Sequence, residues 1–177
     1  MKTKNEAVLS HLMLPDPERD HIYGNHDGDV MILEYGDYEC PYCAEAHDAV
    51  MQLAELLGVR LCYAFRNFPL INKHPNAVSA ALAAEAAASK DEFWEIHDLL
   101  FENQESLDDL ETILEAGGFD ADRIMKQVKS GAHKERVTED REMGIHAGVE
   151  GTPTIFINGQ LYEGDLDPEE MLEIIGE

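Results

Sequence analysis

Two cysteines three residues apart, in the motif Cys40-Pro41-Tyr42-Cys43, follow shortly after an apolar run at residues 30–35. A strand that leads through C-x-x-C into a helix places the first sulfur at the helix N-terminus. There the free backbone N–H groups and the helix dipole favour a thiolate. The second sulfur lies one turn further on and can attack a mixed disulfide formed at the first. The motif therefore predicts thiol–disulfide exchange, with Cys40 attacking and Cys43 resolving.

Metal binding is the competing interpretation of this pair, because C-x2-C is also half of many zinc sites. Such a site needs four ligands, usually completed by a second pair of cysteines or histidines. The third cysteine, Cys62, lies in an apolar run typical of a buried strand, and His47 is the one histidine near the pair. The sequence therefore favours redox chemistry with no metal and no cofactor. A non-enzymatic metal or copper chaperone using Cys40, Cys43 and His47 remains the alternative from a different class.

Composition limits the partners of the chain. Its 177 residues, 44% of them hydrophobic, are enough for one domain with a real core. Lysine and arginine total 13 against 37 acidic residues, which gives a net charge of −24 and excludes a nucleic-acid partner, because phosphate binding needs a basic face. The acids are dispersed along the chain, which is consistent either with a protein kept soluble in high salt or with an ordinary acidic protein.

Targeting signals are weak in this sequence. No stretch approaches the roughly 20 apolar residues of a membrane span. The first residues carry positive charge, but the apolar stretch that follows is broken by Ser10 and His11, and no cleavage pattern follows it. We therefore expect a cytoplasmic protein, or a periplasmic or extracellular one if a leader has been removed.

The hydrophobic pattern predicts one continuous domain that contains a helical block. Residues 1–29 are expected to form an irregular leader, with a short helix near Val8–Met13. Strands at 30–35 and 59–65, joined by a helix at 41–57, form a β-α-β unit, which implies parallel pairing. The expected helices of the block lie at 74–89, 91–101, 106–116, from 120 onward, and at 132–147. A hairpin then follows at 154–162 around Asn158-Gly159, and a last helix begins at Asp167-Pro168.

The chain resembles the thioredoxin superfamily, and specifically its DsbA-like branch. The residues that carry the resemblance are 33–43, 65–70, 93–97 and 151–154. The resemblance implies an α/β thioredoxin fold, with a central mixed sheet flanked by helices and an inserted all-helical subdomain. It also implies a division into a leader at 1–29, a thioredoxin core at 30–73 and 148–177, and an inserted subdomain at 74–147.

The resemblance also implies roles for individual residues. Thr152-Pro153 matches the family's cis-proline, which faces the active-site dipeptide Pro41-Tyr42 and its cysteines and offers a strand edge to a substrate peptide. Glu34 matches a buried acid beneath the active site, which suggests a proton acceptor for Cys43. His47, one turn beyond Cys43, either tunes the pair or is a solvated helix residue.

The expected function is therefore that of a protein disulfide oxidoreductase. Its partners would be proteins that contain thiols or disulfides, together with a redox partner, either a thiol pool or a membrane oxidase. A glutaredoxin-like, glutathione-linked reductase is the nearer alternative, because glutaredoxins share the Cys-Pro-Tyr-Cys motif. The long helical block between Cys43 and Pro153 fits the DsbA-like branch better, because glutaredoxins are compact.

Overall fold

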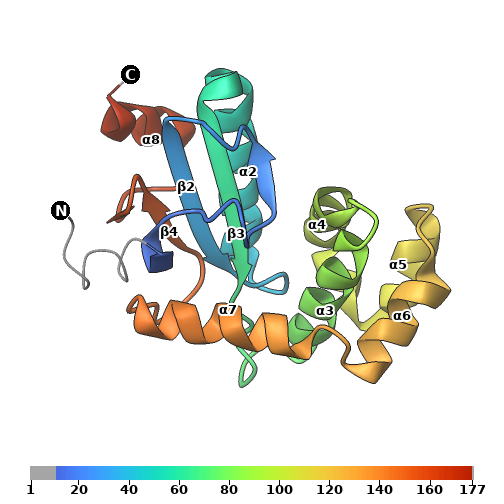
Figure 1. The fold of residues 1–177 in the computed structure, drawn as a ribbon. Helices are drawn as coiled ribbons and strands as arrows, with labels where there is room; N and C mark the ends of the chain where they lie inside the picture. Colours follow the sequence, from blue (N-terminus) through green and yellow to red (C-terminus); the bar gives the residue numbers. More distant parts are fainter. Residues whose placement is uncertain (1–10, 177) are drawn as a thin grey trace.

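A computed structural model describes residues 11–176 of the chain (Figure 1). Its centre is a mixed five-stranded sheet in the order β1-β3-β2-β4-β5. The strands are β1 (Ile22–Gly24), β2 (Val30–Gly36), β3 (Leu61–Asn67), β4 (Thr154–Ile157) and β5 (Gln160–Leu161). Strands β2 and β3 pair in parallel and are joined through helix α2 (Pro41–Leu57), whereas the other pairs are antiparallel. The predicted β-α-β unit and mixed sheet are thereby confirmed.

The remaining helices follow β3 and β5. They are α3 (Ala77–Ala88), α4 (Phe93–Glu102), the 3-10 helix η2 (Gln104–Asp109), α5 (Leu110–Ala116), α6 (Ala121–Ser130), α7 (Lys134–His146) and α8 (Pro168–Ile175). Figure 1 shows α3 to α6 gathered beside the sheet, whereas α7 runs across one end of it. Helix α7 contacts both α3 and β3. The division between core and inserted subdomain remains a prediction, and α7 touches both predicted parts.

The alternation of side chains along β2 divides the interior into two clusters. Val30 and Ile32 face the large cluster that α2 and α3 to α6 share, and Glu34 points to the same face because side chains alternate along a strand. Leu33 and Tyr35 face the second cluster, which α7 covers. The strand that leads to the cysteines is therefore buried on both faces, and its one acid lies on the α2 side.

Part of the segment predicted to be an irregular leader is regular structure. Strand β1 pairs with β3, and Asp20 just before it is buried. The Asp20 carboxylate binds the guanidinium of Arg66 on β3 at 2.7 Å, with both side chains fully enclosed. Because a charge buried this deeply needs a partner, the segment must pack on the sheet. Of the short helix expected near Val8–Met13, residues 11–13 are helical and the rest lies outside the described residues.

Three predicted boundaries are corrected. Strand β3 begins at Leu61, not at residue 59, because α2 ends at Gly58 with φ of 54° and a 3-10 turn, η1 (Gly58–Arg60), follows. Helix α4 begins at Phe93 with Glu92 as its N-cap, not at residue 91, because Asp91 has φ of 58°. The helix expected at 106–116 is split into η2 and α5, because Ser106 has non-helical backbone angles.

The predicted hairpin and last helix are confirmed. Asn158 and Gly159 have φ of 50° and 79° between β4 and β5, the positive values that a tight hairpin turn requires. Asp167 caps α8 by accepting hydrogen bonds from the N–H groups of Glu169 and Glu170.

Candidate active site

Cys40 lies at the N-cap of α2, and Pro41 occupies the first turn. No side chain caps this helix end, so its first N–H groups are left for the sulfur itself. Cys40 is 4% exposed, whereas Cys43, one turn further on, is fully buried, and both thiols are free. The placement that the sequence predicts for the two sulfurs is therefore present.

The loop before β4, which contains Thr152 and Pro153, lies next to Cys40 although the two are distant in sequence. The Thr152–Pro153 peptide bond is cis. The Cys40 thiol donates a hydrogen bond to the Thr152 carbonyl oxygen, with Sγ and O 3.4 Å apart. Strand β4 pairs with β2 through Thr154 and Tyr35, which brings this loop to the end of β2 near the motif. The structure thus brings together Cys40, Thr152 and Pro153.

The environment of Cys40 favours its thiolate. A hydrogen bond from the Cys43 side chain has the largest effect and lowers the pKa of Cys40. Partial burial raises this pKa, whereas Thr152 and the N–H groups of Cys43 and Tyr42 lower it further. Together they lower the pKa of Cys40 to about 5. A thiol with this pKa is ionised at neutral pH and is an effective nucleophile.

We expect the Cys40 thiol to titrate well below the roughly 8.5 of a free thiol. Absorbance at 240 nm against pH reports the thiolate, and the alkylation rate of Cys40 should stay level from pH 6 to 8 and fall below about 5. Cys43→Ser keeps a hydroxyl donor beside Cys40 and should titrate similarly. A thiol that ionises near 8.5 in this variant would contradict the stabilising environment.

Cys43 is the opposite case. Burial first, and then the hydrogen bond to Cys40 and the charge of Glu34, raise its pKa far above the ordinary value of a thiol. The N–H of Asp37 donates a hydrogen bond to the Cys43 sulfur at 3.4 Å. A thiol that is held neutral in this way needs a base before it can attack.

Glu34 lies on β2, fully buried beneath this pair. Burial raises the pKa of its carboxyl group to about 8, a hydrogen bond from Tyr63 opposes the rise, and the charge on Cys40 adds to it. The Tyr63 hydroxyl donates to Oε2 at 3.0 Å, whereas Oε1 has no hydrogen-bond partner. A carboxyl group with a pKa near neutrality can accept and release protons at physiological pH.

Replacing Tyr63 with phenylalanine should raise the pKa of Glu34 further, because the lost hydrogen bond stabilises the charged form. Stability should fall by about 1 kcal/mol. The decline of the unfolding free energy with pH, which begins near the pKa of the unfolded chain and ends near that of the folded protein, should extend to higher pH in the variant, as measured by urea unfolding between pH 5 and 10. Tyr23→Phe is the matched control, since Tyr23 is the cross-strand neighbour of Tyr63 and packs edge-on against Trp94, whereas the hydrogen bond to Glu34 comes from Tyr63. An unchanged pH profile in Tyr63→Phe would contradict this role.

The His47 side chain packs against α4. Its ring stacks on Phe101, with centroids 5.0 Å apart, and its Nε2 lies 3.4 Å from a carboxylate oxygen of Asp98. Burial lowers the pKa of the His47 imidazole. Tuning of the cysteines by His47 remains a prediction, to which these contacts add nothing. Within residues 11–176, no three His, Cys, Asp or Glu side chains are grouped so as to hold a metal ion.

Asp37 is a site residue that the sequence analysis did not single out. Its enclosed carboxylate accepts hydrogen bonds from the N–H groups of Glu39 at 2.8 Å and Leu70 at 2.7 Å, and pairs with His74 Nδ1 at 2.8 Å. Its own N–H reaches Cys43. Asp37 therefore ties the turn before the motif to the loop after β3. Its position just before the motif could have pointed to a role in the site. Its partners Leu70 and His74 could not have been predicted, because they lie more than thirty residues away in sequence.

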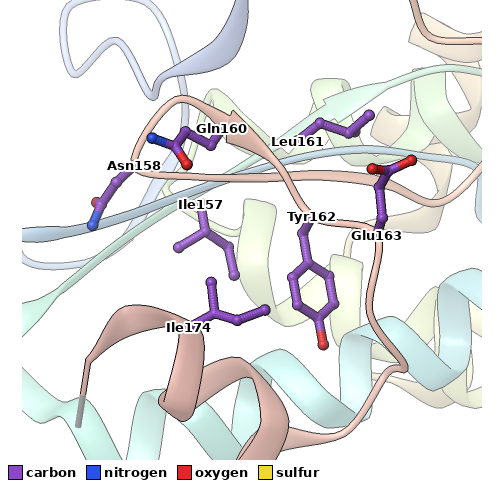
Figure 2. A pocket seen from close by; sticks show the side chains of 7 residues that line it. All are labelled: Ile157, Asn158, Gln160, Leu161, Tyr162, Glu163 and Ile174. Carbon is purple, nitrogen blue, oxygen red and sulfur yellow. The ribbon is translucent and has the colours of Figure 1, made fainter.

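A pocket of about 220 Å³ lies between the β4–β5 hairpin and α8, and Figure 2 shows the side chains that line it. Its lining includes Ile157, Tyr162 and Ile174, and none of the predicted site residues. Ile157 pairs with Ile32, whereas Thr154 pairs with Tyr35 at the end near Pro153. The pocket therefore lies at the opposite end of β4 from the cysteines, and we assign no part of the site to it.

The sequence matches the family described as Thioredoxin over residues 16–177. The chain therefore belongs to the thioredoxin family. Among solved structures it is similar to alpha-DsbA1 from Wolbachia pipientis, with a TM-score of 0.80, 19% identity and coverage of 94% of this chain and 93% of that one. It is also similar to BdbD from Bacillus subtilis, with a TM-score of 0.78, 22% identity and coverage of 92% and 94%. The predicted DsbA-like fold is thereby confirmed.

The relatives found by sequence are named as antiporters, unlike the similar solved structures. The chain is 38% identical over 168 residues to Na(+)/H(+) antiporter NhaA 3 of Salinispora tropica, a match that covers 93% of this chain and 26% of the relative. It is 36% identical over 175 residues to Na(+)/H(+) antiporter NhaA 1 of Mycolicibacterium vanbaalenii, covering 96% and 28%. The chain thus spans about a quarter of the length of these relatives. None of the helices in the described part of the chain is long and apolar enough to cross a membrane.

Proposed function

We propose that this protein is a thiol–disulfide oxidoreductase acting on protein substrates. The observation that carries the proposal is the contrast between two thiols at one helix end. Cys40, at the N-terminus of α2 beside Thr152, has a lowered pKa, whereas Cys43 is buried with a raised one. An ionised attacker next to a neutral resolver is the arrangement that two-step disulfide exchange requires.

In the first step the Cys40 thiolate attacks a substrate disulfide. The substrate S–S bond breaks, one substrate sulfur leaves as a thiolate, and a mixed disulfide joins Cys40 to the other. When Glu34 is in its carboxylate form, the Cys43 thiol transfers its proton to it and attacks the Cys40 sulfur, which forms the Cys40–Cys43 disulfide and releases the second substrate thiolate. The substrate gains two electrons and the protein loses two. Substrate oxidation is the reverse sequence, after which a redox partner restores the disulfide.

Thr152 and Pro153 supply the binding part of the proposal. Their loop lies against Cys40, and β4 continues from it into the sheet. An extended substrate peptide could pair with the backbone of this loop, while its sulfur meets Cys40. Pro41 and exposed Tyr42, which is 64% accessible, form the adjoining surface.

The names of the longer relatives describe ion exchange by those proteins. Because the thioredoxin-family match accounts for residues 16–177, we propose that the part shared with the relatives is a redox unit. Its substrates there would be cysteine-containing segments rather than cations.

The decisive experiment combines turnover with a redox equilibrium. Purified protein should reduce insulin disulfides in the presence of a dithiol, and its Cys40–Cys43 pair should equilibrate with glutathione at a defined ratio. The same protein, reduced, is titrated with zinc and copper. Stoichiometric metal binding without turnover would replace this proposal by the metal-chaperone alternative. Turnover that requires glutathione specifically, and fails with other dithiols, would favour the glutaredoxin-like alternative.

A further inference from the structure

The carboxamide of Gln104, the first residue of η2, lies against the turn that carries Cys40. Its Nε2 atom donates one hydrogen bond to the backbone oxygen of Tyr38 at 2.7 Å and another to that of Cys40 at 2.9 Å. One side chain from the helical block therefore holds the carbonyl groups on both sides of Glu39. These are bonds across more than sixty residues of sequence, made to the backbone of the candidate nucleophile.

The direction of the Cys40 carbonyl matters for its sulfur. This carbonyl belongs to the peptide plane shared with Pro41, so its direction fixes ψ of Cys40, which is 119°. That angle sets how the sulfur faces the N–H groups of Tyr42 and Cys43 in the first turn of α2. Inside the helix this carbonyl also accepts hydrogen bonds from the N–H groups of Cys43 at 3.0 Å and Ala44 at 3.4 Å. No side chain caps this helix end, and Gln104 adds a contact to the same carbonyl from outside the helix.

A second contact joins the same two parts of the molecule. The Tyr38 hydroxyl lies 2.9 Å from Nδ1 of His97 on α4, and both side chains are buried. Leu107 of η2, 2% exposed, is packed into the main core. Tyr38 is therefore held by α4 through its side chain and by η2 through its carbonyl group. Helix η2 is in turn fixed to the core by Leu107.

We propose that Gln104 is a positioning residue that orients the Cys40 backbone so that the first N–H groups of α2 stabilise the thiolate. The inference rests on the proposed function, because it concerns the same sulfur. It assigns to the helical block a direct part in setting the acidity and redox equilibrium of that sulfur.

The test is Gln104→Met, which keeps the length of the side chain and removes both donors. We expect the pKa of Cys40, followed at 240 nm, to rise by about one unit, the size of a lost hydrogen bond. The equilibrium with glutathione should shift about tenfold toward the Cys40–Cys43 disulfide, because the reduced form loses the stabilised thiolate. Gln52→Met is the matched control, since Gln52 lies on the exposed side of α2 and its amide donates to the Asp48 carbonyl of the same helix.

A second pair of variants separates positioning from general loosening. Ile124→Val removes a buried methyl group from α6 and should lower the unfolding temperature while leaving the pKa of Cys40 unchanged. Gln104→Asn, whose shorter amide cannot span both carbonyls, serves if the methionine variant does not fold, and should show the same rise.

The outcomes distinguish this inference from the proposed function. A low pKa in the wild type that stays the same in both Gln104 variants would overturn the inference and leave the proposed function intact. An equal rise in Ile124→Val would also overturn it. An ordinary thiol pKa in the wild type would overturn the proposed function, and this inference with it.

Discussion

Cys43→Ser should accumulate covalent complexes with protein substrates, whereas Cys40→Ser should form none and lose all disulfide reduction. The reason is the order of attack. Without Cys43 the mixed disulfide at Cys40 has no internal thiol to resolve it, and without Cys40 the remaining thiol is buried and neutral. Non-reducing gel electrophoresis followed by mass spectrometry of the trapped species measures the difference.

Cys62→Ser is the matched control for these variants. Cys62 lies on β3, where it pairs with Met31, three residues along β2 from Glu34. Burial raises the pKa of its thiol, so it is a poor nucleophile. Cys62→Ser should keep full turnover and trap nothing. If the Cys40 and Cys43 variants behaved alike, the proposed order of attack would be wrong.

Glu34→Gln should make the reduced protein more stable in alkaline solution. The pKa of Glu34 is about 8 in the folded protein and near 4.5 in the unfolded chain. The neutral acid therefore favours folding fully below pH 4.5, and this contribution is lost as the pH rises toward 8. At about 1.4 kcal/mol per pKa unit, the free energy of unfolding falls by a few kcal/mol by pH 8. Glutamine does not ionise, so the variant does not lose this stability.

Urea unfolding of the reduced protein at pH 5 and pH 8 measures this effect. The two proteins should be nearly equal at pH 5 and differ by a few kcal/mol at pH 8. Ionisation of Cys40 contributes stability that is lost as the pH falls through about 5 in both proteins, and its coupling to Glu34 is smaller than the effect of burial on that acid. Glu45→Gln on the exposed face of α2 should leave the profile of the wild type unchanged. Parallel profiles for Glu34→Gln and the wild type would show that Glu34 ionises normally.

The same variant should also resolve mixed disulfides more slowly, because Cys43 loses its proton acceptor. Stability rises and turnover falls in one substitution, a combination that a purely structural residue would not give.

Local patterns were sufficient to predict the scaffold from the sequence. Helix α2 begins and ends where its apolar spacing and Gly58 place it, and the Asn158-Gly159 turn fixes the last hairpin. The acid of β2 stood out because a charge inside an apolar strand is costly without a partner. These features depend on residues that are neighbours in the sequence, so each carries its own signal.

What could not be predicted are contacts between distant segments. Nothing near Gln104 indicates that its amide reaches Cys40, and nothing near Asp20 indicates an ion pair with Arg66. His97 shows the same limit, because nothing near it in the sequence indicates that it is fully enclosed with its Nδ1 against the Tyr38 hydroxyl. Tertiary packing decides such partners, and a single sequence records only the residue types.

The enclosed guanidinium of Arg66 limits where the chain can be cut. It is bound by Asp20 and Tyr35 and by the backbone oxygens of His11 and Leu14. A shortened chain that started at the first strand would leave a cation in the interior with most of its acceptors gone, at a cost of several kcal/mol. The smallest autonomous unit of this protein therefore reaches back at least to residue 11, and any linker or fusion junction placed between 11 and 20 should compromise folding before it affects catalysis.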